Sequence, residues 1–330
     1  MIISRTPLRV SFAGGGSDLE AFYGHEPGAV VTTAIRKYVY ITVNRKFDSR
    51  IRASYSVTEI VDGVDELRHE LIRESLRTRR IEGGIEVTSI SDIPSQGTGL
   101  GSSSSYTVGL LNALYAYQHQ HVGAERLARE ACDIEIERCG KPIGKQDQYI
   151  AAYGGLQYIQ FNPDGSVFVD PIVCSAATRR ALEAQLLLLY TGTTRSADPI
   201  LAEQRQNLAN GRCRRTLRRL VQLAAELRGA LTGNDLEAFG EILHESWMVK
   251  KSMASGVSNP QIDCWYEQAR AHGAVGGKIS GAGGGGFLLL YAPIDAQAGI
   301  RRALPQLRQI SFGLAPQGSK IIYVEESEGD

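Results

Sequence analysis

The sequence predicts a protein that combines helices and strands and is long enough for two domains or one large domain. The chain has 330 residues, of which 43% are hydrophobic and 22% charged, as in a globular protein with a full core. Alternating apolar residues predict strands over 8–12 and 38–43, and an apolar run predicts a buried strand over 186–190. Helical patterns occupy most of 199–253. Because the pattern changes from strand-rich to helix-rich, we expect a boundary near 175–183.

Local signals justify the other expected elements. A charged amphipathic pattern predicts a helix over 65–79, and alternating β-branched residues predict a strand over 85–90. An Asn-Pro-Asp-Gly turn at 162–165 predicts a hairpin between strands over 157–161 and 167–169. The remaining expected elements are helices over 106–115, 125–139 and 260–272 and strands over 286–291 and 320–324.

Composition and charge argue against several classes of function. The 36 basic and 36 acidic residues give a formal net charge of zero, which disfavours a nucleic-acid or anionic-membrane partner, and the arginine-rich run 212–219 is interpreted as a solvated helix face. No apolar run approaches the ~20 residues that span a bilayer, and the first residues lack signal-peptide features. The five scattered cysteines show no zinc-ligand spacing and no disulfide framework. These features predict a cytoplasmic protein.

The strongest functional signal is the glycine- and serine-rich stretch 94–105, PSQGTGLGSSSS, which lies between an expected strand and an expected helix. Glycine lets a backbone approach a ligand closely, and the first N–H groups of a helix attract anions, so the stretch predicts a phosphate-binding loop. A Walker loop needs a lysine after its last glycine, but Ser102 follows Gly101. The Rossmann spacing is also missed, by one residue. A structural turn is the alternative for a single loop of this kind.

Two carboxylates that follow the loop each allow two interpretations. Glu135 lies within the apolar arc of the helix expected over 125–139, so its side chain should point inward. It is either a magnesium ligand beside the phosphate loop or part of a buried ion pair, for instance with Arg138. Asp147 lies in a polar turn, where it either accepts a proton from a substrate hydroxyl or caps the next helix. Its position alone favours the cap.

Three segments, 6–18, 94–105 and 278–286, resemble in order and spacing the three motifs of the GHMP small-molecule kinases. This family includes galactokinase, homoserine kinase, mevalonate kinase and phosphomevalonate kinase. Within it, residues 144–148 and parts of the first and third segments are most similar to the bacterial D-glycero-D-manno-heptose 7-phosphate kinases, and among these to the capsule-pathway heptokinase. The resemblance spans nearly the whole chain.

The resemblance implies an α+β fold of two domains. The N-terminal domain, residues 1–180, is expected to be ribosomal-S5-domain-2-like and to hold the ATP loop, the metal ligands and the base. The C-terminal domain, residues 181–330, is expected to be ferredoxin-like and to hold the glycine-rich third motif. The active-site cleft is expected between the two domains.

The resemblance also implies roles for particular residues. Asp147 matches a proposed general base, and Arg9 matches its basic partner. Ser103 and Glu135 match the magnesium ligands, which resolves the alternatives for Glu135 in favour of the metal. The expected substrate contacts are Ser17, Asp18, Gly281, Ala282 and Gly283. The expected nucleotide contacts are Gln96, Gly97, Thr98, Gly99, Leu100, Gly101, Ser102, Ser103 and Ser104.

The implied function is ATP-dependent phosphorylation of the anomeric hydroxyl of heptose 7-phosphate, which gives the 1,7-bisphosphate for GDP-heptose and capsule biosynthesis. ATP is the expected co-substrate, Mg²⁺ the expected cofactor and a small sugar phosphate the expected partner. Neither nucleic acid nor a membrane is an expected partner, and a homodimer is left open. The alternatives are another sugar 1-kinase, for fucose, arabinose or mannose, a GHMP-fold decarboxylase, and a catalytically silent sugar or ATP sensor.

Some features depart from the family pattern or leave its details open. Ser104 and Ser105 stand where many members carry Ser-Ala or Ala-Ala. A second phosphate on the substrate would need cations, and Arg195, Lys250 and Lys251 lie on segments that could face the cleft. For each of these three residues, ordinary surface charge is the alternative.

Overall fold

The computed structural model describes residues 1–93, 97–194 and 198–325. In the described residues, the larger sheet has eight strands and runs through two very long ones, β1 and β2. The first part of β2 pairs with β6, and its last part pairs with β5. The strands of this sheet are β12 (Lys320–Val324), β1 (Ile2–Ala13), β2 (Gly28–Arg45), β5 (Ile85–Ser91), β3 (Ile51–Ser54), β4 (Thr58–Val61), β6 (Leu156–Phe161) and β7 (Val167–Pro171).

A buried helix, α3 (Ser102–Tyr117), packs against β1 and β2. Its residues are almost all buried, because its sequence is apolar or small on every side. It begins at Ser102, four residues before the expected start, so the serines that follow Gly101 form its first turn. The neighbouring helices are α1 (Glu20–Tyr23), α2 (Glu70–Arg79), α4 (Ala124–Cys132), the π-helix η2 (Asp133–Arg138) and α5 (Gln146–Tyr153).

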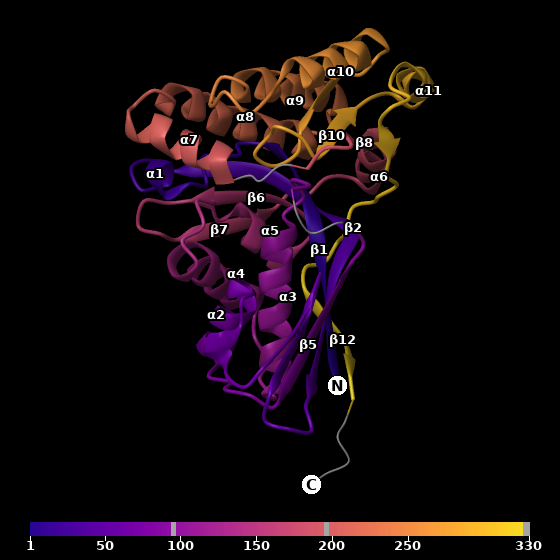
Figure 1. The fold of residues 1–330 in the computed structure, drawn as a ribbon. Coiled ribbons are helices and arrows are strands. Elements are labelled where there is room, and N and C mark those ends of the chain that lie inside the picture. The colour runs from indigo at the N-terminus through magenta and orange to yellow at the C-terminus, as the bar shows by residue number, and fades with distance from the viewer. Residues whose placement is uncertain (94–96, 195–197, 326–330) are drawn as a thin grey trace.

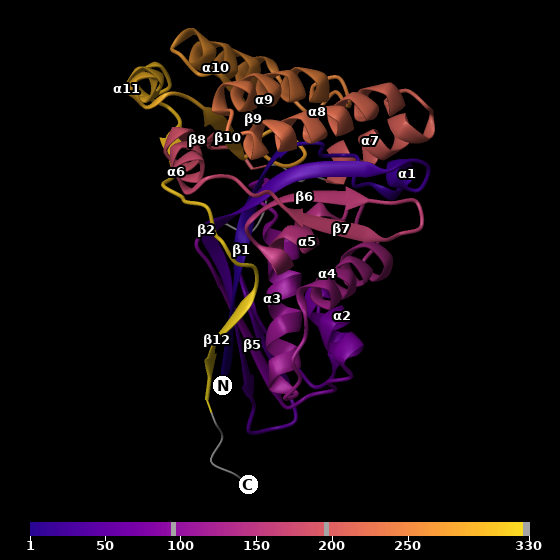
Figure 2. The same ribbon diagram turned by 180° about the vertical axis from the view of Figure 1, so that it is seen from behind.

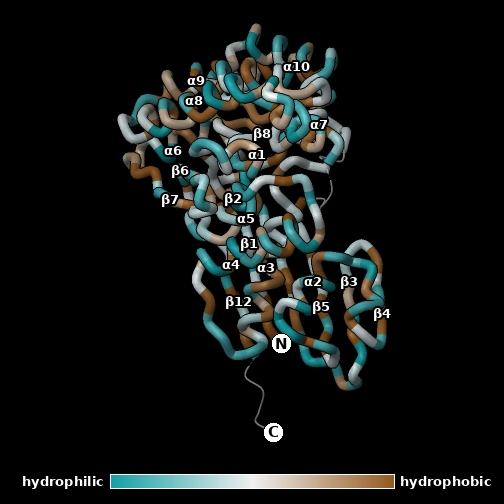
Figure 3. Tube along the Cα trace, turned by 90° about the vertical axis from the view of Figure 1, so that its left-hand side faces the viewer, coloured by the Kyte–Doolittle hydropathy of each residue, from teal (hydrophilic) through white to brown (hydrophobic). Residues whose placement is uncertain are grey.

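A second, four-stranded antiparallel sheet and its helices lie above the first sheet (Figure 1). Its strand order is β11 (Arg308–Gln309), β8 (Leu186–Tyr190), β10 (Phe287–Tyr291) and β9 (Gly276–Ile279). Figure 3 shows the β3–β4 hairpin at the end of the molecule opposite α8, α9 and α10. The helices in the half of the chain that forms the second sheet are α6 (Ala176–Gln185), α7 (Asp198–Ala209), α8 (Arg214–Thr232), α9 (Leu236–Lys250), α10 (Pro260–Ala271) and α11 (Ile294–Ala303).

The end of the chain returns to the first sheet, where β12 pairs antiparallel with β1, as the view from behind shows (Figure 2). The last strand therefore completes the sheet that the first strand begins. The division into 1–180 and 181–330 stays a prediction. In the described residues, no helix is both long enough and apolar enough to cross a bilayer.

Most expected strands are confirmed, but two expectations about helices need correction. The helix expected over 65–79 begins only at Glu70, after a separate 3₁₀ turn at Val64–Glu66. The helix expected over 125–139 is α-helical only to Cys132 and continues as a π-helix. The boundary expected near 175–183 stays a prediction. The helix α6 occupies this segment, and the sequence pattern did not indicate it because only its Thr178 and Leu182 are buried.

Candidate active site

The phosphate-loop candidate takes the backbone shape that its alternating glycines permit. Gly97, Gly99 and Gly101 have φ angles of +68°, +74° and +75°, a region that other residues rarely adopt. Gly101 precedes the first turn of α3, so the free N–H groups of this helix face the loop. Leu100 is fully buried, and its carbonyl accepts a hydrogen bond from the Arg9 N–H at 3.0 Å. The geometry is that of an anion-binding helix start.

The third glycine-rich segment, residues 278–286, packs directly against this loop, backbone against backbone. A Cβ atom on Gly99 would lie 2.3 Å from the Ser280 carbonyl oxygen, and one on Gly281 would lie 2.7 Å from the Gly99 Cα atom. A Cβ atom on Gly286 would lie 2.4 Å from the Thr98 carbonyl oxygen. Side chains at these positions would push the two segments apart, so the glycines fix the distance between them.

One cavity of about 970 Å³ joins the two segments. Among the sequence-predicted residues, Ser17, Leu100 and Glu135 do not line it, and Gln96 lies outside the described residues. Those that line it are Arg9, Asp18, Gly97, Thr98, Gly99, Gly101, Ser102, Ser103, Ser104, Asp147, Gly281, Ala282 and Gly283.

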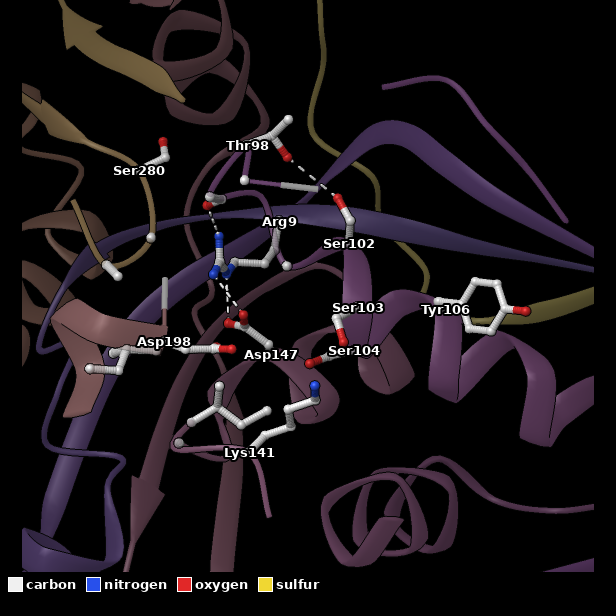
Figure 4. A pocket seen from close by; sticks show the side chains of 18 of the residues that line it. Arg9, Thr98, Ser102, Ser103, Ser104, Tyr106, Lys141, Asp147, Asp198 and Ser280 are labelled. Atoms are coloured by element: carbon white, nitrogen blue, oxygen red, sulfur yellow. Dashed lines mark hydrogen bonds and ion pairs between the residues drawn. The ribbon is translucent and has the colours of Figure 1, made fainter. Parts of the chain in front are cut away.

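Arg9 and Asp147 form a two-bond ion pair inside the cavity (Figure 4). Arg9 Nε donates to Asp147 Oδ1 at 2.7 Å, and Arg9 Nη2 donates to Asp147 Oδ2 at 2.6 Å. The third donor, Arg9 Nη1, bonds the Gly99 carbonyl and so ties the pair to the loop. Asp147 lies in the first turn of α5, whose N-cap is Lys145, so the cap interpretation of Asp147 is wrong. The carboxylate keeps free lone pairs that a substrate hydroxyl can use.

Glu135 is fully buried beside the start of α3. Its Oε1 accepts from the Ser103 hydroxyl at 2.5 Å, and its Oε2 accepts from Gln148 Nε2 at 2.6 Å. The ion pair considered for Arg138 is wrong, because Arg138 Nε binds Asp133 instead, at 2.8 Å. Burial raises the pKa of the Glu135 carboxyl, and hydrogen bonds from Ser103 and Gln148 oppose this shift.

Glu135 lies within the π-helix η2. Cys139 N–H bonds the Ile134 carbonyl five residues earlier, at 2.9 Å, so the turn holds more residues than an α-helical turn. The wider turn changes the direction of the side chains that follow Cys132. Such bulges occur frequently at functional sites. The sequence pattern predicted the inward direction of Glu135 but not the π-helix.

Asp18 is buried and holds two chain segments together. Its Oδ1 accepts from the Gly16 N–H at 2.8 Å, and its Oδ2 accepts from the Gln146 N–H at 3.3 Å, one residue before Asp147. Burial raises the pKa of its carboxyl. Gly144 must be a glycine here, because a Cβ atom would lie 2.0 Å from Asp18 Oδ2. Asp18 therefore positions the segment that carries Asp147 while it lines the cavity.

Ser17 is hydrogen-bonded to Gly14 and does not line the cavity wall. Its hydroxyl is 2.8 Å from the Gly14 carbonyl oxygen and 3.0 Å from that of Ala29, and it accepts from the Ala29 N–H at 3.0 Å. These contacts occupy the hydroxyl, so the placement gives no support to the predicted substrate contact.

The cavity wall also contains residues to which the sequence assigned no role, among them Gln146, Gln204 and Ser280. Of the three open cation candidates, Lys250 lines the cavity, Lys251 does not, and Arg195 lies outside the described residues. Gln204 and Lys250 belong to α7 and α9, helices of the C-terminal half. Gln148, whose side-chain amide donates a hydrogen bond to Glu135 Oε2, was likewise assigned no role.

Comparison with known proteins identifies the family. The model of the GHMP kinase N-terminal domain matches residues 64–155, and that of the GHMP kinase C-terminal domain matches residues 208–307. The chain belongs to the GHMP kinase family. A D-glycero-alpha-D-manno-heptose 7-phosphate kinase of Campylobacter jejuni is 30% identical over 92% of this chain and 93% of its own length.

Solved structures agree with this assignment. The GHMP kinase fold described here matches a D-glycero-D-manno-heptose 1-phosphate kinase from Bacteroides thetaiotaomicron with a TM-score of 0.81 and 25% identity, over 99% of this chain and 100% of that one. A phosphomevalonate kinase from Streptococcus pneumoniae shares the fold at a TM-score of 0.79 and 18% identity, over 96% of this chain and 100% of that one. The α+β fold predicted from the sequence is thereby confirmed.

Proposed function

We propose that this GHMP kinase transfers the γ-phosphoryl group of ATP to the anomeric hydroxyl of D-glycero-D-manno-heptose 7-phosphate. The product would be the 1,7-bisphosphate, an intermediate for GDP-heptose and capsule polysaccharide. The observation that carries the proposal is the Arg9–Asp147 pair, which lies in one cavity with the glycine loop and is bonded to it through the Gly99 carbonyl. The choice of sugar rests on the similarity to the Campylobacter jejuni heptose 7-phosphate kinase.

Phosphoryl transfer needs positioning and charge stabilisation more than covalent chemistry by the protein. The loop from Gly97 to Gly101 and the first turn of α3 would hold the ATP phosphates through backbone N–H groups. Asp147 would accept the proton of the anomeric hydroxyl as the oxygen attacks phosphorus. Arg9 would keep Asp147 ionised and oriented through their two hydrogen bonds.

The donor set beside the loop fits a magnesium ion. Ser103 and Glu135 place a hydroxyl and a carboxylate oxygen 2.5 Å apart, and Mg²⁺ in phosphoryl-transfer sites takes one or two protein oxygens together with phosphates. A bound Mg²⁺ would neutralise charge on the transferred phosphoryl group. Gln148 would hold the Glu135 carboxylate in place by its hydrogen bond to Oε2.

A release assay for ADP across a panel of sugars tests the proposal. The panel contains D-glycero-D-manno-heptose with and without a 7-phosphate, fucose, arabinose and mannose. We expect turnover with heptose 7-phosphate and formation of an acid-labile anomeric phosphate. Turnover with fucose instead would favour the alternative that the fucokinase relatives from Arabidopsis thaliana and Bacteroides fragilis suggest, at 26% and 25% identity. ATP binding without turnover of any sugar would favour a sensor.

A further inference from the structure

Two lysines of the C-terminal half are buried beside the cavity. Lys250, at the end of α9, is 6% exposed, and Lys278, on β9, is 2% exposed. In the described residues neither forms an ion pair with a carboxylate, although the partly buried lysines Lys46, Lys141 and Lys251 do. A buried ammonium group without a counter-ion is costly, so buried lysines are normally paired. The pair therefore indicates an anionic ligand.

The surroundings of Lys250 place this anion in the active-site cavity. Lys250 lines the cavity together with Asp18, Gln146, Gln204 and Ser280. Its closest hydrogen-bond partner is the Gly15 carbonyl oxygen, at a long 3.5 Å. The ammonium group can therefore turn toward a ligand at the cost of one weak contact.

Basic groups outnumber acidic groups around the two lysines. Lys278 interacts electrostatically with Lys250, Arg9 and Asp18, and burial lowers the pKa of both ammonium groups. Arg9 is neutralised by Asp147. Among these five groups, three are basic and two are acidic, so an anionic ligand would find more basic than acidic groups here.

Two unpaired polar side chains point to the chemistry of this ligand. Gln204 Nε2 and Ser280 Oγ are buried without a hydrogen-bond partner, and both residues line the cavity. Gln204 is 1% exposed and Ser280 2% exposed. An amide N–H and a hydroxyl can both donate to oxygen atoms. Beside an unpaired lysine, such donors suit a phosphate or the hydroxyl-rich group that carries it.

We propose that Lys250, supported by Lys278, forms a phosphate-binding site in the wall of the cavity that the C-terminal half contributes. The inference rests on the proposed kinase function and adds to it the residues that meet a phosphate from this side. Phosphate could come from two sources: the acceptor sugar's own phosphate, or the phosphoryl group in transfer from ATP. A lysine suits either source, because it binds phosphate as a point charge and does not need two-point geometry.

The test is Lys250→Met, which keeps an unbranched chain and removes the charge. If the site binds the acceptor's own phosphate, we expect KM for heptose 7-phosphate to rise about 10–100-fold, as for a lost hydrogen bond to a charged group, with no change for unphosphorylated heptose. If it binds the transferred phosphoryl group, kcat should fall for both acceptors and KM should stay. Wild-type kcat and KM for both acceptors would overturn the inference.

A binding measurement keeps this test independent of the sugar. Inorganic phosphate is titrated calorimetrically into the protein loaded with ADP. We expect its affinity to fall at least tenfold in Lys250→Met, to stay within tenfold in Lys250→Arg and to fall less in Lys278→Met than in Lys250→Met. Because no sugar is turned over, a wrong choice of sugar would leave this result intact. Equal phosphate affinity in wild type, Lys250→Met and Lys278→Met would contradict the site.

Lys251→Met is the matched control. Lys251 is the next residue along the chain, but it pairs with Asp263 at 3.0 Å and does not line this cavity. We expect wild-type phosphate affinity and kinetics. The unfolding temperature separates binding from structure, because loss of an unpaired buried charge should raise it for the ligand-free Lys250→Met protein. A lower unfolding temperature with unchanged phosphate affinity would mean that Lys250 is only structural.

Discussion

The two walls of the cavity differ in how their polar groups are satisfied. On the N-terminal wall, the charged groups are paired: Arg9 is bonded to Asp147, and Ser103 is bonded to Glu135, although Gln146 Oε1 has no partner. On the C-terminal wall, Lys250 has one long contact, and Gln204 Nε2 and Ser280 Oγ have no partner. The charged groups of the first wall are therefore arranged before any ligand arrives, as electrostatic catalysis requires. The second wall keeps its donors unpaired, as a surface that gains its partners from a ligand would.

The contact between the two glycine segments fixes the relative position of the walls. Gly99 and Gly281 touch backbone to backbone, and Ser280 belongs to the same contact. The N-terminal wall, which we call the paired wall, and the C-terminal wall, which we call the unpaired wall, thus meet at a backbone contact. A side chain at Gly99 or Gly281 would clash there. A phosphate bound near this backbone contact would touch both walls at once.

The largest effect is expected from Asp147→Asn, which breaks the pairing of the first wall. An amide is a poor proton acceptor and accepts weaker hydrogen bonds from Arg9, so we expect kcat to fall by about 10²–10⁴, the size of a general-base contribution. ATP affinity, measured by calorimetry, should change little. Single-turnover kinetics measure the loss at the chemical step.

Asp65→Asn is the control for this change. Asp65 also binds an arginine, Arg77, at 2.5 Å, but its side chain is 83% exposed. An exposed pair of this kind contributes little, so we expect wild-type kcat. Unchanged turnover in Asp147→Asn would mean that the paired wall has no part in proton transfer.

A smaller effect is expected from Gln148→Met, which removes the side-chain amide that holds the Glu135 carboxylate in place. The variant loses the hydrogen bond to Glu135 Oε2. Residues that orient a metal ligand typically change metal affinity about 10–100-fold, so the Mg²⁺ concentration for half-maximal activity should rise by that factor. Calorimetric titration of Mg²⁺ into the ADP complex provides a readout that needs no turnover.

Gln157→Met separates this effect from a loss of stability. Gln157 is also buried, but it donates to the Gly154 carbonyl at 2.8 Å and lies outside the cavity wall. It should lower the unfolding temperature and leave the Mg²⁺ requirement unchanged. The same outcome in Gln148→Met would assign Gln148, and the Ser103–Glu135 bond with it, to structure alone.

The sequence predicted the paired wall better than the unpaired one. The glycine loop and the inward direction of Glu135 followed from local rules, since glycine spacing and helical phase depend on near neighbours. The pairing of Arg9 with Asp147 joins residues 138 positions apart, so it entered only through the family resemblance. The partner of Glu135 at Gln148 left no local signal, because a π-helix and a turn separate the two residues.

The unpaired wall did leave a signal in helical phase. In α9, Lys250 continues the buried stripe of Phe239, Leu243 and Trp247, whereas Lys251 falls outside it. In α7, Gln204 lies between the buried residues Ile200 and Leu208 at four-residue spacing. A polar residue in an apolar phase was the argument applied to Glu135, and it applies equally to these two. What the sequence could not supply is that two separate helices bring them to one cavity.

The smallest effect is expected from Gln204→Met, which removes one neutral donor from the unpaired wall. A typical hydrogen bond contributes about 0.5–1.5 kcal/mol, so KM for the acceptor sugar should rise about 2–10-fold while kcat stays near wild type. The ligand-free protein should not lose stability, because Gln204 Nε2 has no partner to lose. Gln206→Met, on the exposed side of the same helix, should leave KM unchanged. If Gln204→Met lowers the unfolding temperature and leaves KM at its wild-type value, Gln204 belongs to the packing of α7, and the unpaired wall is reduced to Lys250 and Ser280.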